Sequence, residues 1–281
     1  MHAIESTIEL LGGTQIPRLG LGVFEAGAGQ GTENAVGWAL QAGYRHIDTA
    51  KVYGNEVEVG NAIRSSGVNR DEVFVTSKVI NEDQGYEATL SACNASLDRL
   101  QLDYLNLYLI HWPEAGKEIA TWRALIELRD QGRCRAIGVS NFAISRMQLL
   151  IDATDVVPEV NQVEFHPFMY RSRLLNWCKE LGIVLEAYCP LARGYGFDHA
   201  TVQAIAARHD KSPAQVYLRW SLQRDVVVIP KSSHRDRIAQ NAEIFDFALT
   251  DEDMTALDAL NTFHTVAWLP PDWPDSIELD N

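Results

Sequence analysis

The sequence predicts an α/β protein with a (β/α)8 barrel fold, the TIM barrel, preceded by a β-hairpin. Eight short strand-like runs alternate with segments in which apolar residues recur every three or four positions, as in amphipathic helices. The length of 281 residues suits one such barrel. Polar residues able to do chemistry follow the ends of most runs, which is where barrels of this kind have their active sites.

The first predicted element is the hairpin. Residues 6–22 (STIELLGGTQIPRLGLG) carry alternating strand-like residues on both sides of Gly12 and Gly13. A pair of glycines between two such runs predicts a tight turn.

The eight barrel strands follow, and each is a short run of apolar or β-branched residues. They are expected at residues 19–22 (LGLG), 46–49 (HIDT), 73–78 (VFVTSK), 105–110 (LNLYLI), 136–140 (AIGVS), 159–165 (EVNQVEF), 184–188 (VLEAY) and 226–230 (VVVIP).

Helical patterns lie between these runs, and several of them end at a glycine, as helices tend to. Clear examples are residues 31–43 (GTENAVGWALQAG), 87–101 (EATLSACNASLDRLQ), 120–132 (ATWRALIELRDQG) and 171–182 (RSRLLNWCKELG). The alternative is a doubly wound open sheet, but residues 21–24 (LGVF) break the G-x-G-x-x-G fingerprint expected after its first strand. We therefore predict one barrel domain over residues 1–281, without an interdomain linker.

The carboxyl-terminal tail differs from the rest of the chain. From Asn261 onward it contains three prolines and two tryptophans and has no helical period. We interpret it as an extended segment over the domain, in which Trp268 and Trp273 either cover an apolar surface or line a ligand pocket.

Composition limits the classes of function. The net charge of −14 disfavours nucleic acid and anionic membranes as partners. Four widely spaced cysteines form no C-x-x-C motif, which favours reduced thiols over a disulfide framework or a zinc site. The start, MHAIESTIEL, lacks the pattern of a signal peptide, and no apolar run approaches the ~20 residues needed to cross a bilayer. We expect a cytoplasmic protein.

Reactive side chains gather at the predicted strand ends. In chain order they are Asp48 with Tyr53 just beyond it, Lys78, His111, Ser140 with Asn141, Tyr188, and Lys231. Each has an ordinary structural explanation when taken alone, but all the strand ends of a barrel meet at one rim.

Four of these residues suit carbonyl chemistry. A free tyrosine has a pKa of about 10, and a nearby ammonium such as that of Lys78 favours its phenolate, while Asp48 can hold the ammonium in place. Tyr53 would then donate a proton to a carbonyl oxygen as hydride reaches the carbon, and His111 would orient the same oxygen.

Hydride chemistry needs a carrier, and a basic cluster offers a place for one. Residues 229–241 (IPKSSHRDRIAQN) follow the last strand and begin a helix, so Lys231, Ser232, His234 and Arg237 would surround a helix N-terminus that favours phosphate. This set suits the 2′-phosphate of NADPH, although a solvated basic helix start is the plainer interpretation. Tyr188 would stack on nicotinamide, with Ser140, Asn141 and Gln162 at its carboxamide; taken alone, Tyr188 would be core.

Six motifs together resemble the aldo-keto reductase superfamily, in order and across nearly the whole chain. They are GYRHIDTAKVYGNE, VFVTSK, LYLIHWP, IGVSNF, NQVEFHP and IPKSSHRDRIAQN. The resemblance implies a barrel closed at its base by the hairpin and a catalytic tetrad of Asp48, Tyr53, Lys78 and His111. It further implies NADPH/NADP+ as cofactor, held by Ser140, Asn141, Gln162, Tyr188, Leu191, Lys231, Ser232, His234, Arg237 and Asn241. Gln240 stands where the family often has Glu, which weakens one expected adenine contact.

Within the superfamily, residues 81–100 and the modest length are most similar to the bacterial branch that includes 2,5-diketo-D-gluconate reductases. Departures fall where substrates bind, because Phe24 and Ile80 stand where many relatives have tryptophan. The candidate pocket residues are Phe24, Ile80, Tyr108, Trp112 and Trp268.

The function expected from the resemblance is reversible, NADPH-dependent reduction of aldehydes, ketones or dicarbonyls by a protein that is commonly a monomer. One alternative is a non-catalytic NADPH-binding relative with an interaction or regulatory role, which a lost tetrad residue would indicate. Another is a metal-dependent barrel hydrolase, but its candidates have no H-x-H or H-E-x-x-H spacing. Those candidates are Asp48, His111, Glu164 and His166.

Overall fold

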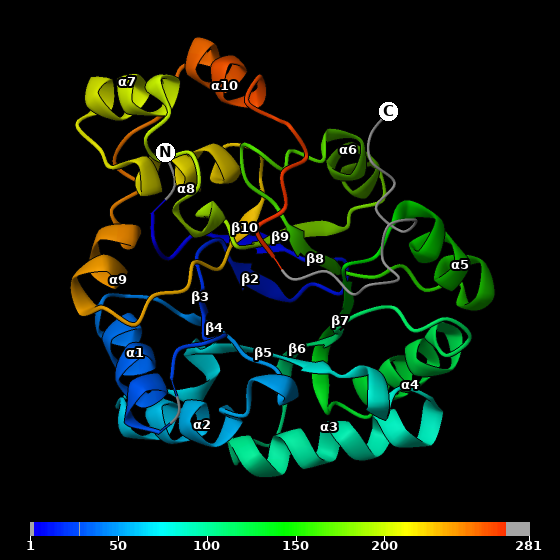
Figure 1. Cartoon of the computed structure of the whole chain (residues 1–281). Helices are drawn as coiled ribbons and strands as arrows, with labels where there is room; N and C mark the ends of the chain where they lie inside the picture. The colour runs from blue at the N-terminus through cyan, green and yellow to red at the C-terminus, as the bar shows by residue number, and fades with distance from the viewer. Residues whose placement is uncertain (1–2, 28, 268–281) are drawn as a thin grey trace.

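A computed structural model describes residues 3–27 and 29–267, and its centre is one curled sheet of eight parallel strands (Figure 1). Neighbouring strands follow one another along the chain, from β3 to β10. The strands are β3 Leu21–Gly22, β4 His46–Asp48, β5 Phe74–Val79, β6 Leu105–Ile110, β7 Cys134–Ser140, β8 Val160–Glu164, β9 Val184–Tyr188 and β10 Val227–Val228. Each one falls within or beside a run expected from the sequence.

The first and last strands close the sheet into a ring. Leu19 pairs with Val228 and Gly22 pairs with Lys231, both as parallel bridges. The Gly20 N–H donates to the Val228 carbonyl at 2.9 Å, so the backbone hydrogen bonding continues across the seam. The fold is therefore the predicted (β/α)8 barrel, and the open-sheet alternative is wrong.

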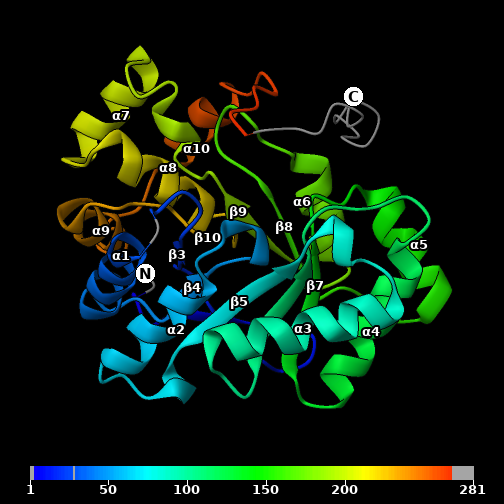
Figure 2. The same ribbon diagram turned by 60° about the horizontal axis from the view of Figure 1, so that its bottom comes forward.

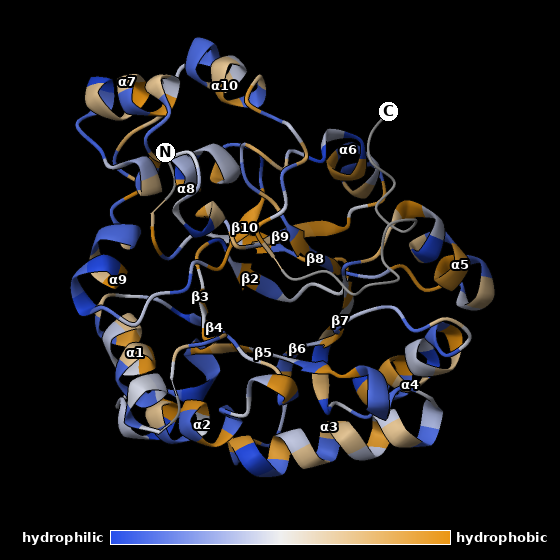
Figure 3. Cartoon of the chain, in the orientation of Figure 1, coloured by the Kyte–Doolittle hydropathy of each residue, from blue (hydrophilic) through white to orange (hydrophobic). Residues whose placement is uncertain are grey.

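Helices surround the barrel, and two views show them outside the strands (Figures 1 and 2). They are α1 Gln30–Gln41, α2 Glu56–Ser65, α3 Tyr86–Leu100, α4 Glu118–Asp130, α5 Ile144–Thr154, α6 Ser172–Glu180, α7 Ala200–His209, α8 Pro213–Leu222, α9 Arg235–Ala242 and α10 Asp251–Asp258. Coloured by hydropathy, the helices carry mixed apolar and polar faces around a mostly apolar barrel wall (Figure 3). This distribution is what amphipathic helices packed on a buried sheet require.

The predicted hairpin closes one end of the barrel. Strands β1 (Thr7–Glu9) and β2 (Gln15–Pro17) pair antiparallel on either side of the glycine turn. Leu10 and Ile16 from this hairpin pack in one buried cluster with residues such as Phe74 and Val184, which begin their strands. The hairpin thus seals the amino-terminal end and leaves the carboxyl-terminal end for ligands.

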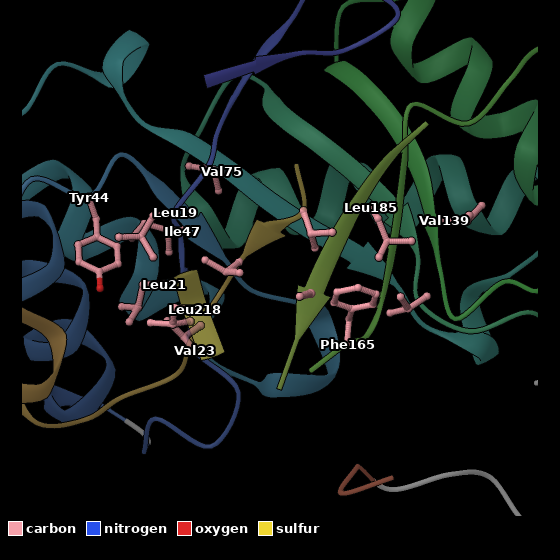
Figure 4. Close-up of a cluster of buried hydrophobic side chains, with 14 of the residues drawn as sticks. Leu19, Leu21, Val23, Tyr44, Ile47, Val75, Val139, Phe165, Leu185 and Leu218 are labelled. Carbon is pink, nitrogen blue, oxygen red and sulfur yellow. The ribbon is translucent and has the colours of Figure 1, made fainter. Parts of the chain in front are cut away.

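The alternation of side chains along each strand divides the core into two layers. The larger cluster lies between strands and helices and includes Ile47, Val75, Val139 and Leu185 (Figure 4). The other residues of the same strands face the barrel axis, because successive side chains point to opposite faces.

The alternation also decides which residues reach the site. On β5 the axis-facing positions are Phe74, Thr76 and Lys78, so the interior changes from apolar to charged toward the carboxyl end. On β6, Tyr108 occupies a position that faces away from the barrel axis. It is fully buried in the outer layer, against helices, and the expectation that it lines the pocket is wrong.

Close packing of neighbouring strands depends on Gly138. A β-carbon at this position would lie 2.5 Å from the Val160 carbonyl oxygen and 2.9 Å from the Leu109 side chain. Those distances are too short for any side chain.

The tail is described as far as Ala267 and is fixed to the barrel rim. The Asn261 side-chain amide donates to the Tyr170 carbonyl at 3.0 Å, and its oxygen accepts from the Tyr170 N–H at 3.0 Å. Trp268 and Trp273 lie outside the described residues. In the described part of the chain, no helix is long and apolar enough to span a bilayer.

Candidate active site

A cavity of about 1200 Å³ opens at the carboxyl ends of the strands. Its lining includes sixteen of the residues singled out in the sequence: Phe24, Asp48, Tyr53, Ile80, His111, Trp112, Ser140, Asn141, Gln162, Tyr188, Leu191, Lys231, Ser232, His234, Arg237 and Asn241. Lys78 lies behind this lining, fully buried. The strand ends therefore bring one site together from segments spread over the whole chain.

Lys78 contacts two of the other predicted residues. Its Nζ donates to Asp48 Oδ1 at 2.7 Å, to Asp48 Oδ2 at 2.8 Å, and to the Tyr53 hydroxyl at 3.3 Å. A fourth contact, to the Thr49 carbonyl at 3.0 Å, holds the ammonium in place. The short 3-10 helix Lys51–Tyr53, directly after β4, carries the phenol back over the strand end.

Electrostatics set the protonation states of this group. Burial tends to lower the pKa of Lys78, but the negative charge of Asp48 and its hydrogen bonds to the ammonium oppose this, and the net pKa is raised. For Tyr53 burial is the largest influence and raises its pKa to about 12, against the opposing effect of Lys78. The expectation that Lys78 brings the phenol below its usual pKa is therefore wrong here, because desolvation of the phenolate exceeds the attraction of the ammonium. Tyr53 is a neutral O–H donor.

His111 lies at the end of β6 with its ring edge-on to Tyr53, and the ring centroids are 5.7 Å apart. Burial, aided by the charge of Lys78, lowers the pKa of His111 to about 3. The imidazole is neutral near pH 7, so it can form hydrogen bonds but supplies no proton as an imidazolium.

Asn141, directly after β7, fixes a polar corner of the cavity. Its backbone is left-handed, with φ of 63°, an unusual conformation for a residue other than glycine. Its side-chain oxygen accepts from the Tyr188 hydroxyl at 2.8 Å, and its amide nitrogen donates to Ser140 Oγ and the His111 carbonyl, each at 3.1 Å. Tyr188 is thereby locked beside the polar end of the cavity.

Gln162 on β8 has both of its amide hydrogens engaged. Its Nε2 donates to Asp48 Oδ2 at 2.8 Å and to Glu186 Oε2 at 2.6 Å. Glu186, on β9, is fully buried, and its pKa is raised to about 8 by burial and by the nearby charge of Asp48. This carboxyl was not predicted from the sequence.

A basic edge of the cavity lies at the start of α9. Lys231, His234 and Arg237 are exposed there, and no carboxylate in residues 3–27 and 29–267 forms an ion pair with any of them. Ser232 Oγ accepts from the His234 N–H at 3.1 Å and shapes the turn that enters the helix. Free cations beside a helix N-terminus form a favourable place for phosphate.

Another part of the cavity lining is more apolar. Phe24 is 46% exposed and packs 5.0 Å from the Tyr53 ring, and Val52 is 60% exposed. Ile80 and Trp112 complete this wall.

Two loops meet at the cavity mouth through an ion pair. Arg193, after β9, lies 3.7 Å from Glu25, which follows β3. Neither residue was predicted for the site, since both belong to loops with no distinctive pattern. Glu186, by contrast, could have been found from the sequence, because a carboxylate inside an apolar strand-like run is unusual.

Glu164 at the end of β8 binds the tail. Its oxygens accept from the Val266 N–H at 2.7 Å and from Thr265 Oγ1 at 2.6 Å, and His166 Nε2 lies 3.0 Å away. The next residue, Ala267, lines the cavity. Glu164 and His166, two of the residues considered for a metal site, thus bind each other. Across the residues that the structure describes, no group of three or more His, Cys, Asp or Glu could hold a metal ion.

Comparison with known proteins agrees with this geometry. The model of the Aldo/keto reductase family matches residues 18–262. A glyoxal reductase of Bacillus subtilis is 52% identical over 92% of this chain and 94% of its own length. A morphine 6-dehydrogenase of Pseudomonas putida is 47% identical over 91% of each chain.

Among solved structures, an aldo-keto reductase of Bombyx mori in complex with NADP superposes with a TM-score of 0.90. It is 36% identical, and the match covers 98% of each chain. The likeness therefore extends over the whole barrel, including the cavity end.

Proposed function

Because the chain belongs to the aldo/keto reductase family and is an NADP(H)-dependent oxidoreductase, we propose that it reduces aldehydes, ketones and dicarbonyls to alcohols with Tyr53 as proton donor. The observation that supports this most directly is the contact of the Tyr53 hydroxyl with Lys78, at the wall of a cavity that continues to the basic edge of α9.

Tyr53 suits an acid role in its observed protonation state. Its raised pKa, about 12, keeps the phenol protonated at neutral pH, and an alkoxide is a strong enough base to take the proton. Lys78 then faces the phenolate that forms, and Asp48 keeps Lys78 charged and in position. This arrangement favours the charge distribution that develops as the proton moves.

His111 would orient the substrate. A neutral imidazole next to Tyr53 can donate a hydrogen bond to the same carbonyl oxygen, which helps to hold that oxygen near the phenol. In the reverse reaction Tyr53 would take the proton back from an alcohol, so the same group serves both directions.

The residues present fit NADPH, which supplies the hydride when bound. Lys231, Ser232, His234 and Arg237 would hold the 2′-phosphate, and Asn241 would lie near the adenine. Ser140, Asn141, Gln162, Tyr188 and Leu191 would hold the nicotinamide end. The fit is supported by Lys231 and Arg237 at α9, which form no ion pair with the carboxylates that the structure describes, and by the oxygen of Gln162, whose amide hydrogens are already used on Asp48 and Glu186.

Two relatives point to different substrates. One relative is named a glyoxal reductase, after a small dicarbonyl, whereas another of similar identity is named a morphine 6-dehydrogenase, after a bulky alcohol. The apolar wall of Phe24, Ile80 and Trp112 suits uncharged carbonyl compounds. We further propose one domain that acts as a monomer in the cytoplasm, a setting that matches four cysteines without a disulfide.

The proposal is tested by following NADPH absorbance with glyoxal, methylglyoxal, aromatic aldehydes and keto-sugars, and the reverse reaction with alcohols and NADP+. The Tyr53→Phe variant should lose about 10²- to 10⁴-fold in turnover, the usual contribution of general acid catalysis, while NADPH binding measured by fluorescence stays near wild type. Tyr104→Phe is a matched control, because its hydroxyl bonds to Asp71 away from the cavity. Bound NADPH without turnover of any carbonyl would favour the non-catalytic alternative.

A further inference from the structure

We propose that Glu186 is a positioning residue that fixes the amide orientation of Gln162, so that Gln162 Oε1 faces the cavity and accepts a hydrogen bond from the carboxamide NH2 of nicotinamide. The inference rests on the proposed cofactor site, and it assigns a role to a buried carboxyl that has no part in proton transfer.

The two side chains are neighbours by strand register. Gln162 on β8 pairs with Glu186 on β9, so both face the barrel axis at the same level. Gln162 is 2% exposed and Glu186 is fully buried. Their contact of 2.6 Å, Nε2 to Oε2, is therefore shielded from water.

Two acceptors on one side of Gln162 decide how its amide lies. Asp48 Oδ2 and Glu186 Oε2 both face Nε2, at 2.8 Å and 2.6 Å. The reversed amide would place Oε1 against the Asp48 carboxylate, which only accepts hydrogen bonds. With both N–H groups used inward, Oε1 is the group that Gln162 has left for a ligand, and Gln162 lines the cavity.

Asp48 accepts only one of the two amide hydrogens, and it shares both of its oxygens with Lys78. Glu186, by contrast, makes its one side-chain hydrogen bond in the described part of the chain to Gln162, and its Oε1 has no partner there. The nearest ring nitrogen to that oxygen, His46 Nε2, is 3.5 Å away.

The protonation state of Glu186 is compatible with this role. Its raised pKa of about 8 keeps the carboxyl neutral near pH 7, and with the proton on Oε1, Oε2 accepts from Gln162 without adding a second negative charge beside Asp48. Burying an acid such as Glu186 lowers the stability of the protein. Its contact with Gln162, a residue of the cavity, is a functional reason for its presence.

The test compares two cofactors that differ at one group. NADP+ carries a carboxamide, and its 3-acetylpyridine analogue has a methyl group in place of the NH2 while keeping the carbonyl. Dissociation constants of both are measured by titration calorimetry with wild type, Glu186→Leu and Glu186→Met. Two apolar variants are used because either one alone could fail to fold.

We expect the wild type to prefer NADP+ and the apolar variants to lose about three- to tenfold of that preference, the effect of one neutral hydrogen bond. Glu186→Gln should restore the preference for NADP+, since the side-chain oxygen of the introduced glutamine can accept from Gln162 as Glu186 does. In a Gln162→Ala background, Glu186→Leu should change the preference no further.

The outcomes separate this inference from the function on which it rests. Equal weakening of both cofactors in the apolar variants would indicate a merely structural Glu186 and overturn the inference. A wild type with no preference for NADP+ over the analogue would overturn it as well. A wild type that binds neither nucleotide would instead refute the proposed function.

Discussion

Lys78 holds both carboxylate oxygens of Asp48 inside the barrel, at 2.7 Å and 2.8 Å from its Nζ, and neither side chain is more than 2% exposed. Removing one charge leaves the other buried without compensation, which typically costs about 3–5 kcal/mol. We expect Asp48→Asn to lower the free energy of unfolding in urea by roughly that amount.

The chain offers a matched control for this change. Asp83 pairs with Lys51 where both side chains are partly exposed, and exposed pairs contribute at most about 1 kcal/mol. Asp83→Asn should therefore be nearly neutral. Equal stability losses in the two variants would mean that the pair of Lys78 and Asp48 is solvated in the protein.

The pH dependence should differ between the two directions of reaction. Tyr53 has a raised pKa of about 12, so this proposed proton donor keeps its proton at pH values well below 12. Reduction measured in a single turnover with the Glu186→Gln variant, which removes the other group that titrates in this range, should be flat from about pH 6 to 9. Alcohol oxidation should accelerate with pH because it needs the deprotonated phenol. A reduction rate that falls to half within this range would contradict the raised pKa.

Cofactor preference should depend on particular cations at α9. Arg237→Ala and Lys231→Ala should each reduce the preference for NADPH over NADH by about tenfold, because charge-assisted hydrogen bonds contribute more than neutral ones. Arg235→Ala is the control, since Arg235 lies on the same helix outside the cavity lining. Affinity for NADPH in the wild type should also weaken with added salt. Equal losses of cofactor preference in Arg235→Ala and Arg237→Ala would mean that α9 attracts NADPH only through its overall positive charge.

Substrate charge should matter at the apolar wall. Glu82 lines the cavity near Ile80, and the cation of nearby Lys51 is bound to Asp83. We expect 4-nitrobenzaldehyde to exceed 4-carboxybenzaldehyde in kcat/KM by about fivefold or more, the effect of one like charge at short range in water. Glu82→Gln should narrow the gap, and Glu87→Gln, outside the lining, should not. A higher kcat/KM for 4-carboxybenzaldehyde would contradict this prediction and indicate a cation beside the bound substrate.

The barrel and its rim were predictable because strand period and strand ends are local signals. Asp48, Lys78 and His111 each end a strand-like run, and parallel strands necessarily bring such ends together. Tyr108 shows where that reasoning fails. It was expected to line the pocket, but the alternation along β6 turns it toward the helices.

Other features depend on packing that no local pattern encodes. The pKa of Tyr53 follows the balance between burial and the charge of Lys78, and only the folded geometry sets that balance. The link from Glu186 through Gln162 to Asp48 joins three strands distant in sequence. The ion pair of Arg193 and Glu25 depends on how two loops fold over the mouth.

The seam between the first and last barrel strands has a consequence for how the protein is made. Gly22 and Lys231 pair across it, although they come from opposite ends of the chain. Folding pays a high loop-closure entropy for such distant contacts, which tend to form late. A ribosome must therefore deliver nearly the whole chain before the ring can shut, and both partners of the seam also line the cavity. An unclosed barrel lacks part of the wall of this cavity, and a ligand that binds the cavity stabilises the finished ring.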